Sequence, residues 1–168
     1  MLVWKDILTG DEMISDSYKY AYIYEGACLE VKAKMVSKGG EDFGFENNEE
    51  DGGALENNVE TVIDIVDAHK LVEVKDWSKK DFTTYVKGYL KKIKAKLTEE
   101  GKQDRIADFQ KGATEMVKFI LSKFEEMQIF SGESADFDGS LAFAFWADGD
   151  TDGPTFLYFN DGLKEEKF

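Results

Sequence analysis

Residues 78–124 read SKKDFTTYVKGYLKKIKAKLTEEGKQDRIADFQKGATEMVKFILSKF, and this stretch decides the fold class. Apolar residues recur there every three or four positions, which is the period of a helix with one buried face. The first run is Phe82, Tyr85, Val86, Tyr89, Leu90, Ile93 and Leu97, and the second is Ile106, Phe109, Ala113, Met116, Val117, Ile120, Leu121 and Phe124. Ser78 and Asp81 match a helix capping box, and Gly101 marks a break between the runs. The stretch predicts an antiparallel helical hairpin over about residues 78–126.

The polar side of the first predicted helix is rich in lysine. The candidates for a partner-binding basic face are Lys87, Lys91, Lys92 and Lys94. Such a face is either simply solvated or binds an acidic protein partner. Nucleic acid is not expected as a partner, because the formal net charge is −14 and no glycine–aromatic recognition motif accompanies the lysines.

The segments on both sides of the hairpin have strand character. Residues 28–35 alternate between polar and apolar side chains, which indicates a half-buried antiparallel strand. Residues 59–74 contain a β-branched cluster and also predict strand structure. After the hairpin, apolar runs at 129–133, 140–146 and 155–159 are separated by turn formers. The order strands, helical pair, strands predicts an α+β fold with mostly antiparallel sheets.

Length and composition limit the class of protein. The chain of 168 residues suits a single domain spanning 1–168. Cys28 is the only cysteine, so the sequence offers neither an intrachain disulfide nor a multi-cysteine zinc site, and we expect a packed thiol. No signal peptide and no apolar run long enough for a membrane span are evident, so we expect a cytoplasmic location.

Two acidic segments are candidate calcium sites. Residues 41–60 hold eight acids and four asparagines without Lys or Arg, which predicts a mobile acidic loop. Its oxygens, those of Asp51 among them, either bind calcium or remain solvated. The motif DGDTDG at 148–153 matches the start of a calcium loop, with Asp148, Asp150 and Asp152 as ligands. The twelfth position is Phe159 where a bidentate acid is needed, so a hairpin turn is the competing interpretation.

The sequence gives no sign of catalysis. His69 is the only histidine and is assigned no role. No nucleophile elbow, phosphate-binding loop or dinucleotide-binding glycine motif is present. We therefore expect a binding protein and not an enzyme, with no required cofactor.

Several segments resemble one known family in the same order along the chain. They are DEMISDSYK at 11–19, CLEVKAKMVS at 28–37, KKDFTTYVKGYLKKIKAKL at 79–97, FSGESADFDG at 130–139 and DGLKEEK at 161–167. Together they resemble the translationally controlled tumour protein family over essentially the whole chain.

The resemblance implies a β-tent fold with a protruding helical hairpin. It also implies a cytosolic, multifunctional regulator of growth and survival that opposes cell death, binds calcium weakly and associates with tubulin or microtubules. The alternative that it implies is an accessory or exchange factor for a small GTPase of the Rheb type. By position, Glu12 and Glu133 match the GTPase contact, and Asn48 and Asp138 match positions linked to weak calcium binding.

Overall fold

The computed structural model describes residues 1–37 and 60–168. Almost the whole of the predicted acidic loop at 41–60 therefore lies outside the described residues, with only Glu60 inside them. Over the described part, 36% of residues are helical and 31% lie in strands, and the sheets do not close into a barrel.

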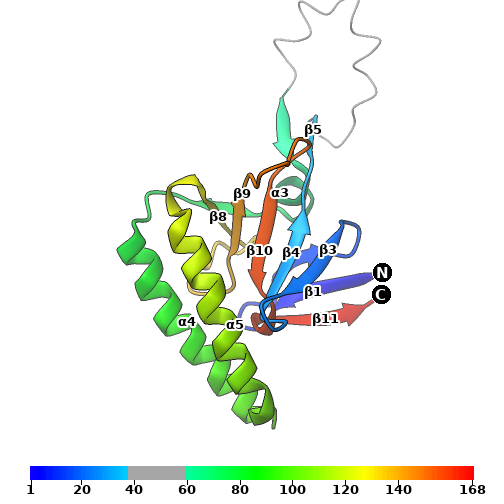
Figure 1. The fold of residues 1–168 in the computed structure, drawn as a ribbon. Helices are drawn as coiled ribbons and strands as arrows, with labels where there is room; N and C mark the ends of the chain where they lie inside the picture. The colour runs from blue at the N-terminus through cyan, green and yellow to red at the C-terminus, as the bar shows by residue number, and fades with distance from the viewer. Residues whose placement is uncertain (38–59) are drawn as a thin grey trace, which may run out of the picture.

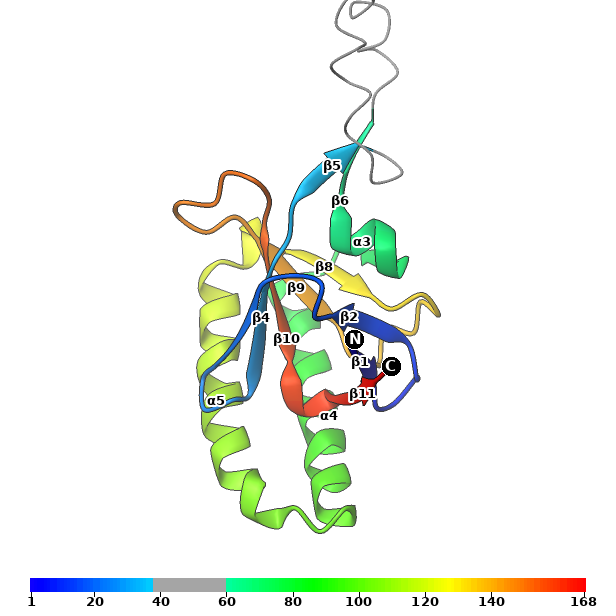
Figure 2. The ribbon, with the colours of Figure 1, turned by 90° about the vertical axis from the view of Figure 1, so that its right-hand side faces the viewer.

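The helical hairpin is confirmed. It consists of α4 (Lys79–Glu99) and α5 (Gln103–Ser122), followed by the short 3-10 helix η1 (Phe124–Glu126). The helices lie side by side and extend past the end of the sheets (Figures 1 and 2). The capping box is also confirmed, since the Ser78 hydroxyl accepts from the Asp81 backbone and the Asp81 carboxylate accepts from the Ser78 backbone. Gly101 provides the left-handed residue (φ 75°) of the connection.

The largest sheet has six strands in the order β3-β4-β10-β9-β8-β7. All of its neighbouring strands pair antiparallel, as the sequence predicts. The strands are β3 (Tyr20–Ile23), β4 (Cys28–Lys32), β7 (Val72–Val74), β8 (Gln128–Ser131), β9 (Ala142–Phe145) and β10 (Thr155–Phe159). The hairpin covers one face of this sheet (Figure 1).

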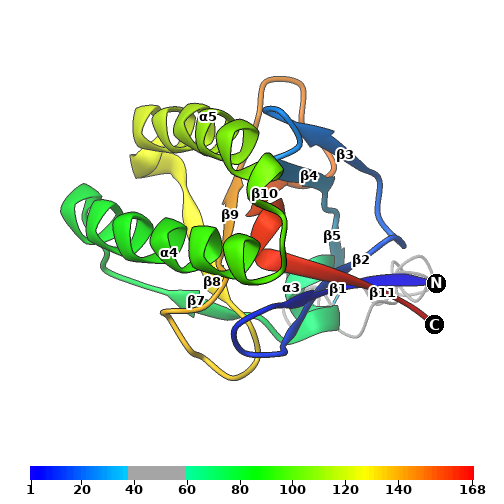
Figure 3. The ribbon, with the colours of Figure 1, turned by 90° about the horizontal axis from the view of Figure 1, so that it is seen from below.

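A second sheet packs on the face of the six-stranded sheet that the hairpin leaves free, and the two sheets together form the tent. It has the order β11-β1-β2, formed by β1 (Leu2–Asp6), β2 (Glu12–Ser15) and β11 (Leu163–Lys167). The 3-10 helix η2 (Asn160–Gly162) leads from β10 into β11. β1 and β11 run side by side and bring the two ends of the chain together (Figure 3). A small separate pair joins β5 (Met35–Ser37) to β6 (Thr61–Ile63).

The central strands of the six-stranded sheet are buried on both faces, which gives the protein two hydrophobic cores. On β10, Leu157 and Phe159 belong to the core under the hairpin, whereas Phe156 and Tyr158 belong to the core inside the tent. Cys28 is fully buried under the hairpin, so the packed thiol is confirmed, and burial raises its pKa. β4 is therefore covered on both faces at its start and is not a simple half-exposed strand.

One local prediction was wrong. Within 59–74, residues Asp64–His69 form the helix α3, because the Asp64 carboxylate accepts from the backbone N–H groups of Lys34 (2.9 Å) and Ile65 (2.8 Å) and anchors its first turn. Ile65 is then buried inside the tent, and this packing outweighs its β-propensity. Glu12–Ser15 forms β2, because Met13 and Ile14 enter the same core.

Candidate functional site

Two turns from distant parts of the sequence meet on one face of the tent. Asp11, before β2, accepts hydrogen bonds through Oδ2 from the backbone N–H (3.2 Å) and hydroxyl (2.6 Å) of Ser134, after β8. A Cβ on Gly132 would lie 2.6 Å from the Cβ of Asp11, so only glycine permits this approach. Glu12 and Glu133, each adjacent in sequence to a residue of this contact, are thus presented by segments that touch.

A buried carboxylate supports both turns. Asp6 at the end of β1 accepts hydrogen bonds from the Leu8 backbone (2.8 Å), the Thr9 hydroxyl (2.9 Å) and the Ser140 backbone (2.7 Å). It is only 3% exposed, so these three bonds replace its lost hydration. Sequence reasoning missed Asp6, although a strand that ends in Asp before a Thr-Gly turn is a recognisable signal of a side-chain cap.

Glu12 has a histidine neighbour that the sequence did not reveal. Its Oε1 lies 3.7 Å from Nδ1 of His69, whose side chain is only 5% exposed, while the Glu12 side chain is 51% exposed. Nε2 of His69 has no hydrogen-bond partner among the described residues. Burial lowers the pKa of His69, although the carboxylates of Glu12 and Asp64 act in the opposite direction. The lowered pKa favours the neutral form of His69 at pH 7.

The turn after β8 adds further exposed acids to this face. Glu133, Asp136 and Asp138 are all exposed, and the Asp136 carboxylate accepts from the Asp138 backbone at 3.0 Å. Phe137 between them is 38% exposed. Within the described residues, no Lys or Arg forms an ion pair with Glu12 or with these three acids. These four acids give the face an excess of negative charge, with Lys5 opposite Glu12 in the β1–β2 pair, and such a surface suits a basic partner.

The DGDTDG segment forms the connection between β9 and β10, and its three aspartates differ in role. Asp150 accepts from the Ala147 backbone (2.9 Å) and the Thr155 hydroxyl (2.8 Å), and it faces Lys32 Nζ at 3.4 Å. Burial by itself raises the pKa of Asp150, but these hydrogen bonds and the lysine charge outweigh burial and lower it. Asp148 and Asp152 are exposed and leave their carboxylates toward solvent.

The other calcium candidates are not gathered with these aspartates. Asp138 lies beyond the opposite end of β9 from Asp148, and Asn48 and Asp51 fall in the segment that is not described. In residues 1–37 and 60–168, no group of three or more His, Cys, Asp or Glu side chains is arranged to hold a metal ion. A calcium site in the described part would therefore need ligands that converge only on binding.

The predicted basic face is present on the outside of α4. Lys87 and Lys91 are exposed and Lys94 is half-buried, opposite the buried stripe that packs on the sheet. Lys92 is exposed but lies about 100° around the helix from Lys91, so it does not share this face. Lys80, Lys87, Lys91 and Lys94 are seven, four and three residues apart and therefore share one face. None of these lysines has an ion-pair partner within 4.0 Å among the described carboxylates.

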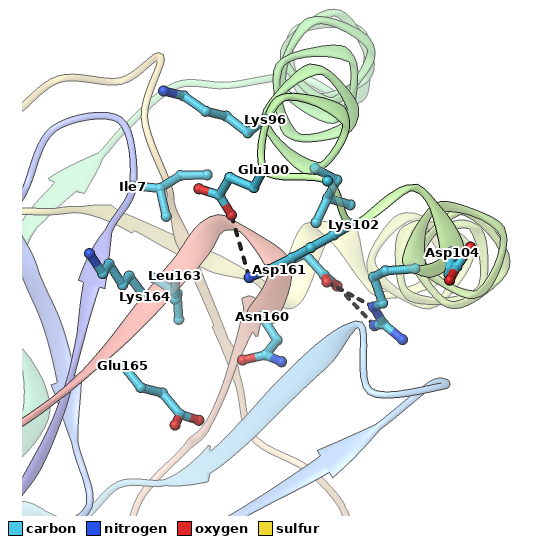
Figure 4. A pocket seen from close by; sticks show the side chains of 13 residues that line it. Ile7, Lys96, Glu100, Lys102, Asp104, Asn160, Asp161, Leu163, Lys164 and Glu165 are labelled. Atoms are coloured by element: carbon cyan, nitrogen blue, oxygen red, sulfur yellow. Dashed lines mark hydrogen bonds and ion pairs between the residues drawn. The ribbon is translucent and has the colours of Figure 1, made fainter.

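A pocket of about 760 Å³ lies between the tip of the hairpin and the start of β11 (Figure 4). Two ion pairs line it, since Arg105 makes two bonds of 2.9 Å to Asp161 and Lys102 lies 3.4 Å from Glu100. The Asp161 bond raises the pKa of Arg105. Arg105 also donates to the carbonyl of Glu25 in the β3–β4 turn (2.8 Å). The cluster therefore joins α5 to that turn and to η2, which contains Asp161. We interpret it as a structural junction.

In the described ranges, no helix has both the length and the apolar character needed to cross a membrane.

The chain is 42% identical over 174 residues to the "Translationally-controlled tumor protein homolog" of Lonomia obliqua, and 39% identical over 177 residues to homolog 1 of Dictyostelium discoideum. Both alignments cover 100% of this chain and of the relative.

Solved structures agree with these relatives. The Translationally Controlled Tumor-associated Protein p23fyp of Schizosaccharomyces pombe matches with a TM-score of 0.79 and 31% identity over 100% of both chains. The protein from Caenorhabditis elegans matches with a TM-score of 0.71 and 32% identity over 100% of this chain and 99% of its own. The profile described as "Translationally controlled tumour protein" matches residues 1–164, and the chain therefore belongs to the translationally controlled tumour protein family.

Proposed function

We propose that this protein is a cytoplasmic regulator that associates with microtubules and binds calcium, and that it acts in growth and survival through protein–protein contacts. The observation that carries the proposal is the lysine stripe of α4 on a chain of net charge −14. Lys80 and Lys94 are 14 positions apart, so the stripe extends for about 21 Å along the helix. Lysines without an ion-pair partner among the described carboxylates, spread over that length, complement an extended acidic segment such as the carboxyl-terminal tail of tubulin.

Co-sedimentation with microtubules tests this contact. The variant Lys87→Glu/Lys91→Glu/Lys94→Glu reverses the stripe, and we expect it to lose binding. The matched control Lys70→Glu/Lys118→Glu/Lys164→Glu makes the same change of charge at exposed lysines elsewhere and should bind like the wild type. Microtubules from which the acidic tails have been cleaved should bind neither the wild type nor the control variant. Equal binding of the stripe variant and the control would contradict the proposal.

The calcium part of the proposal rests on exposed carboxylates. Asp148 and Asp152 lie in the β9–β10 connection, Asp138 lies in the turn after β8, and Asn48 and Asp51 add oxygens from the undescribed segment. Capture of a cation would relieve repulsion among these acids, which favours weak binding. Asp150 is already engaged by Lys32 and Thr155, so we assign it a supporting role.

Trp146 offers an optical test of calcium binding. It is 48% exposed and two positions before Asp148, so its excitation should sensitise a terbium ion bound in this turn. We expect terbium emission that calcium displaces and that Asp148→Asn/Asp152→Asn abolishes. Asp138→Asn should leave the emission unchanged, because its turn lies at the other end of β9. An NMR titration without shifts at 41–60, 138 or 148–153 in millimolar calcium would refute the calcium part.

The contact between the Glu12 and Glu133 turns supports a second candidate function, as an accessory or exchange factor for a small GTPase of the Rheb type. A face rich in acidic side chains could favour one nucleotide state of a partner by differential binding, without covalent chemistry. The wild-type protein should accelerate nucleotide release from the GTPase. The variants Glu12→Val and Glu133→Ala should accelerate it less than the exposed control Glu126→Ala does. Release that does not respond to the wild type would exclude this function for the GTPase used.

A further inference from the structure

The six-stranded sheet ends in a strand that is open to solvent. β3 is its outermost strand and pairs only with β4 among the described residues. Tyr20, Ala21 and Tyr22 are all exposed, and the two tyrosines keep 39% and 44% of their surface. Three consecutive exposed residues in a regular strand are a surface that needs an explanation, because unpaired strand edges readily pair with other chains.

The backbone of β3 leaves alternate residues without partners. The Lys32 N–H donates to the Lys19 carbonyl (2.9 Å), and Ala21 lies opposite Glu30 in the same register. In an antiparallel pair every second residue bonds to the neighbouring strand, so the bonding positions are 19, 21 and 23. The N–H and C=O groups of Tyr20 and Tyr22 therefore point away from β4. No residue in the described part of the chain bonds to them.

The other edges of the two larger sheets carry the features that prevent strand addition. β11 presents four consecutive charges at 164–167, and α3 packs beside β2. β7 has three residues, with the exposed Glu73 at its centre. In contrast, β3 reads YAYI and contains no charge, proline or glycine. β3 is thus the edge of these two sheets that is left unprotected.

The side chains of β3 indicate what kind of segment fits. The Tyr20 ring packs edge-on against Trp4 at 5.1 Å, and the Tyr22 hydroxyl donates to Glu165 at 2.9 Å. Burial and this hydrogen bond raise the pKa of Tyr22 to about 12, so the hydroxyl stays protonated. The rings are therefore held as a fixed apolar platform beside the open backbone groups, next to a carboxylate. A neighbouring strand with apolar side chains at alternate positions would cover them.

Charge indicates whether a second copy of this chain or a different protein would pair with β3. A second copy of this chain would bring another net charge of −14 to the edge, and Glu25, Glu30 and Glu165 lie on or beside the strands concerned. Repulsion opposes self-pairing and favours a positively charged segment.

We propose that β3 is a docking edge where an extended, net-positive segment of a partner protein adds as a seventh strand, with its alternate apolar side chains on Tyr20 and Tyr22. Main-chain hydrogen bonds would supply affinity, and the tyrosine rings would supply a preference for segments with apolar side chains at alternate positions. This surface uses neither the α4 lysines nor the Glu12 and Glu133 turns, and it is independent of the proposed function.

Hydrogen exchange of the free protein is the first test. The amides of Tyr20 and Tyr22 should exchange rapidly while those of Ala21 and Ile23 are protected. Equal protection of all four amides would show that the edge is already covered, and protection that grows with protein concentration would identify a second copy. Either result would overturn the proposal.

A displayed library of random dodecapeptides, selected on the full chain, is the second test. Selected peptides should alternate apolar and polar residues, carry positive charge, and protect the Tyr20 and Tyr22 amides on binding. Failure to select any peptide, or protection confined to other elements, would contradict the proposal.

Two substitutions separate backbone pairing from ring contacts. Tyr22→Pro removes the outward N–H without breaking a bond to β4, whereas Tyr22→Ala removes only the ring. We expect Tyr22→Pro to bind the selected peptides about tenfold more weakly than Tyr22→Ala. Unchanged exchange protection at β4 and β10 would verify that both variants are folded. Equal affinity of the two variants would refute strand addition.

Discussion

Two glycines in the hairpin illustrate how the same residue type serves different needs. Gly112 of α5 faces the β3–β4 turn, where an added Cβ would lie 2.8 Å from the Ala27 Cβ and would also meet the Tyr24 carbonyl. Gly88 of α4 is exposed, and an added Cβ would meet nothing within 4 Å. Close packing therefore requires the first glycine, and the second only weakens its helix.

Alanine substitutions should move stability in opposite directions at these positions. Gly112→Ala should destabilise the protein by about 1–3 kcal/mol, because the helix must move off the turn. Gly88→Ala should stabilise it by about 0.5–1 kcal/mol through helix propensity alone. Urea unfolding of both variants beside the wild type measures the difference. A stabilising Gly112→Ala would show that α5 does not lie this close to the turn.

His69 should make stability depend on pH. Its pKa in the folded state is lowered from the ordinary value of 6.5, so the unfolded chain takes up the proton first as the pH falls. Stability should therefore decline from about pH 6.5 downward until the folded-state pKa is passed, by at most about 1.4 kcal/mol per pH unit. His69→Gln should lack this component in urea unfolding between about pH 8 and about pH 5. Parallel curves for the two proteins would contradict a buried, neutral His69.

At the scale of elements, Arg105 joins the start of α5 to the strands. Its guanidinium bonds to Asp161 in η2 and to the Glu25 carbonyl in the β3–β4 turn, where Tyr24 and Glu25 have left-handed φ values of 53° and 58°. Non-glycine residues seldom adopt this conformation, so the turn depends on contacts made by α5. The hairpin is thus fastened at its tip as well as packed along its length.

Arg105→Lys tests this fastening, because lysine keeps the charge but loses the two-pronged geometry. We expect a loss of about 1–2 kcal/mol in stability and faster amide exchange in the β3–β4 turn. The control Lys111→Met removes a largely exposed lysine 3.9 Å from Glu25 and should change stability by less than about 0.5 kcal/mol. If the control has the larger effect, the Arg105 cluster is not the junction that we infer.

The whole molecule carries its charge unevenly. Acidic residues outnumber Lys and Arg by 35 to 21, yet the exposed face of α4 is basic and the turns with Glu12 and Glu133 are acidic. Such a distribution presents two surfaces for partners of opposite sign. Self-repulsion of the net charge also opposes folding.

Salt should therefore stabilise the protein as a whole. Raising sodium chloride from about 0.02 M to about 0.5 M screens the net repulsion, and we expect Tm to rise by roughly 2–4 °C. The stripe variant Lys87→Glu/Lys91→Glu/Lys94→Glu makes the charge more negative and should respond more strongly. A fall of Tm with salt would show that local ion pairs outweigh net repulsion.

The accuracy of the sequence-based predictions followed the range of the interactions involved. The hairpin and its capping box were predictable because residues three or four apart determine them. Asp64–His69 was mispredicted because Ile65 is β-branched, while its helix depends on a contact with Lys34 and on burial in the tent. The aspartates of 148–153 were found by motif, but only the structure distinguishes the engaged Asp150 from the exposed Asp148.

By itself, the sequence determined the helical hairpin, the antiparallel strands around it, the net charge and the lysines of α4, since each follows from local spacing or from composition. Only the tertiary structure decided which turns meet through Asp11 and Ser134, that His69 lies beside Glu12, and that β3 is an open edge. These features join residues more than 50 positions apart or depend on strand order, and no local pattern encodes either.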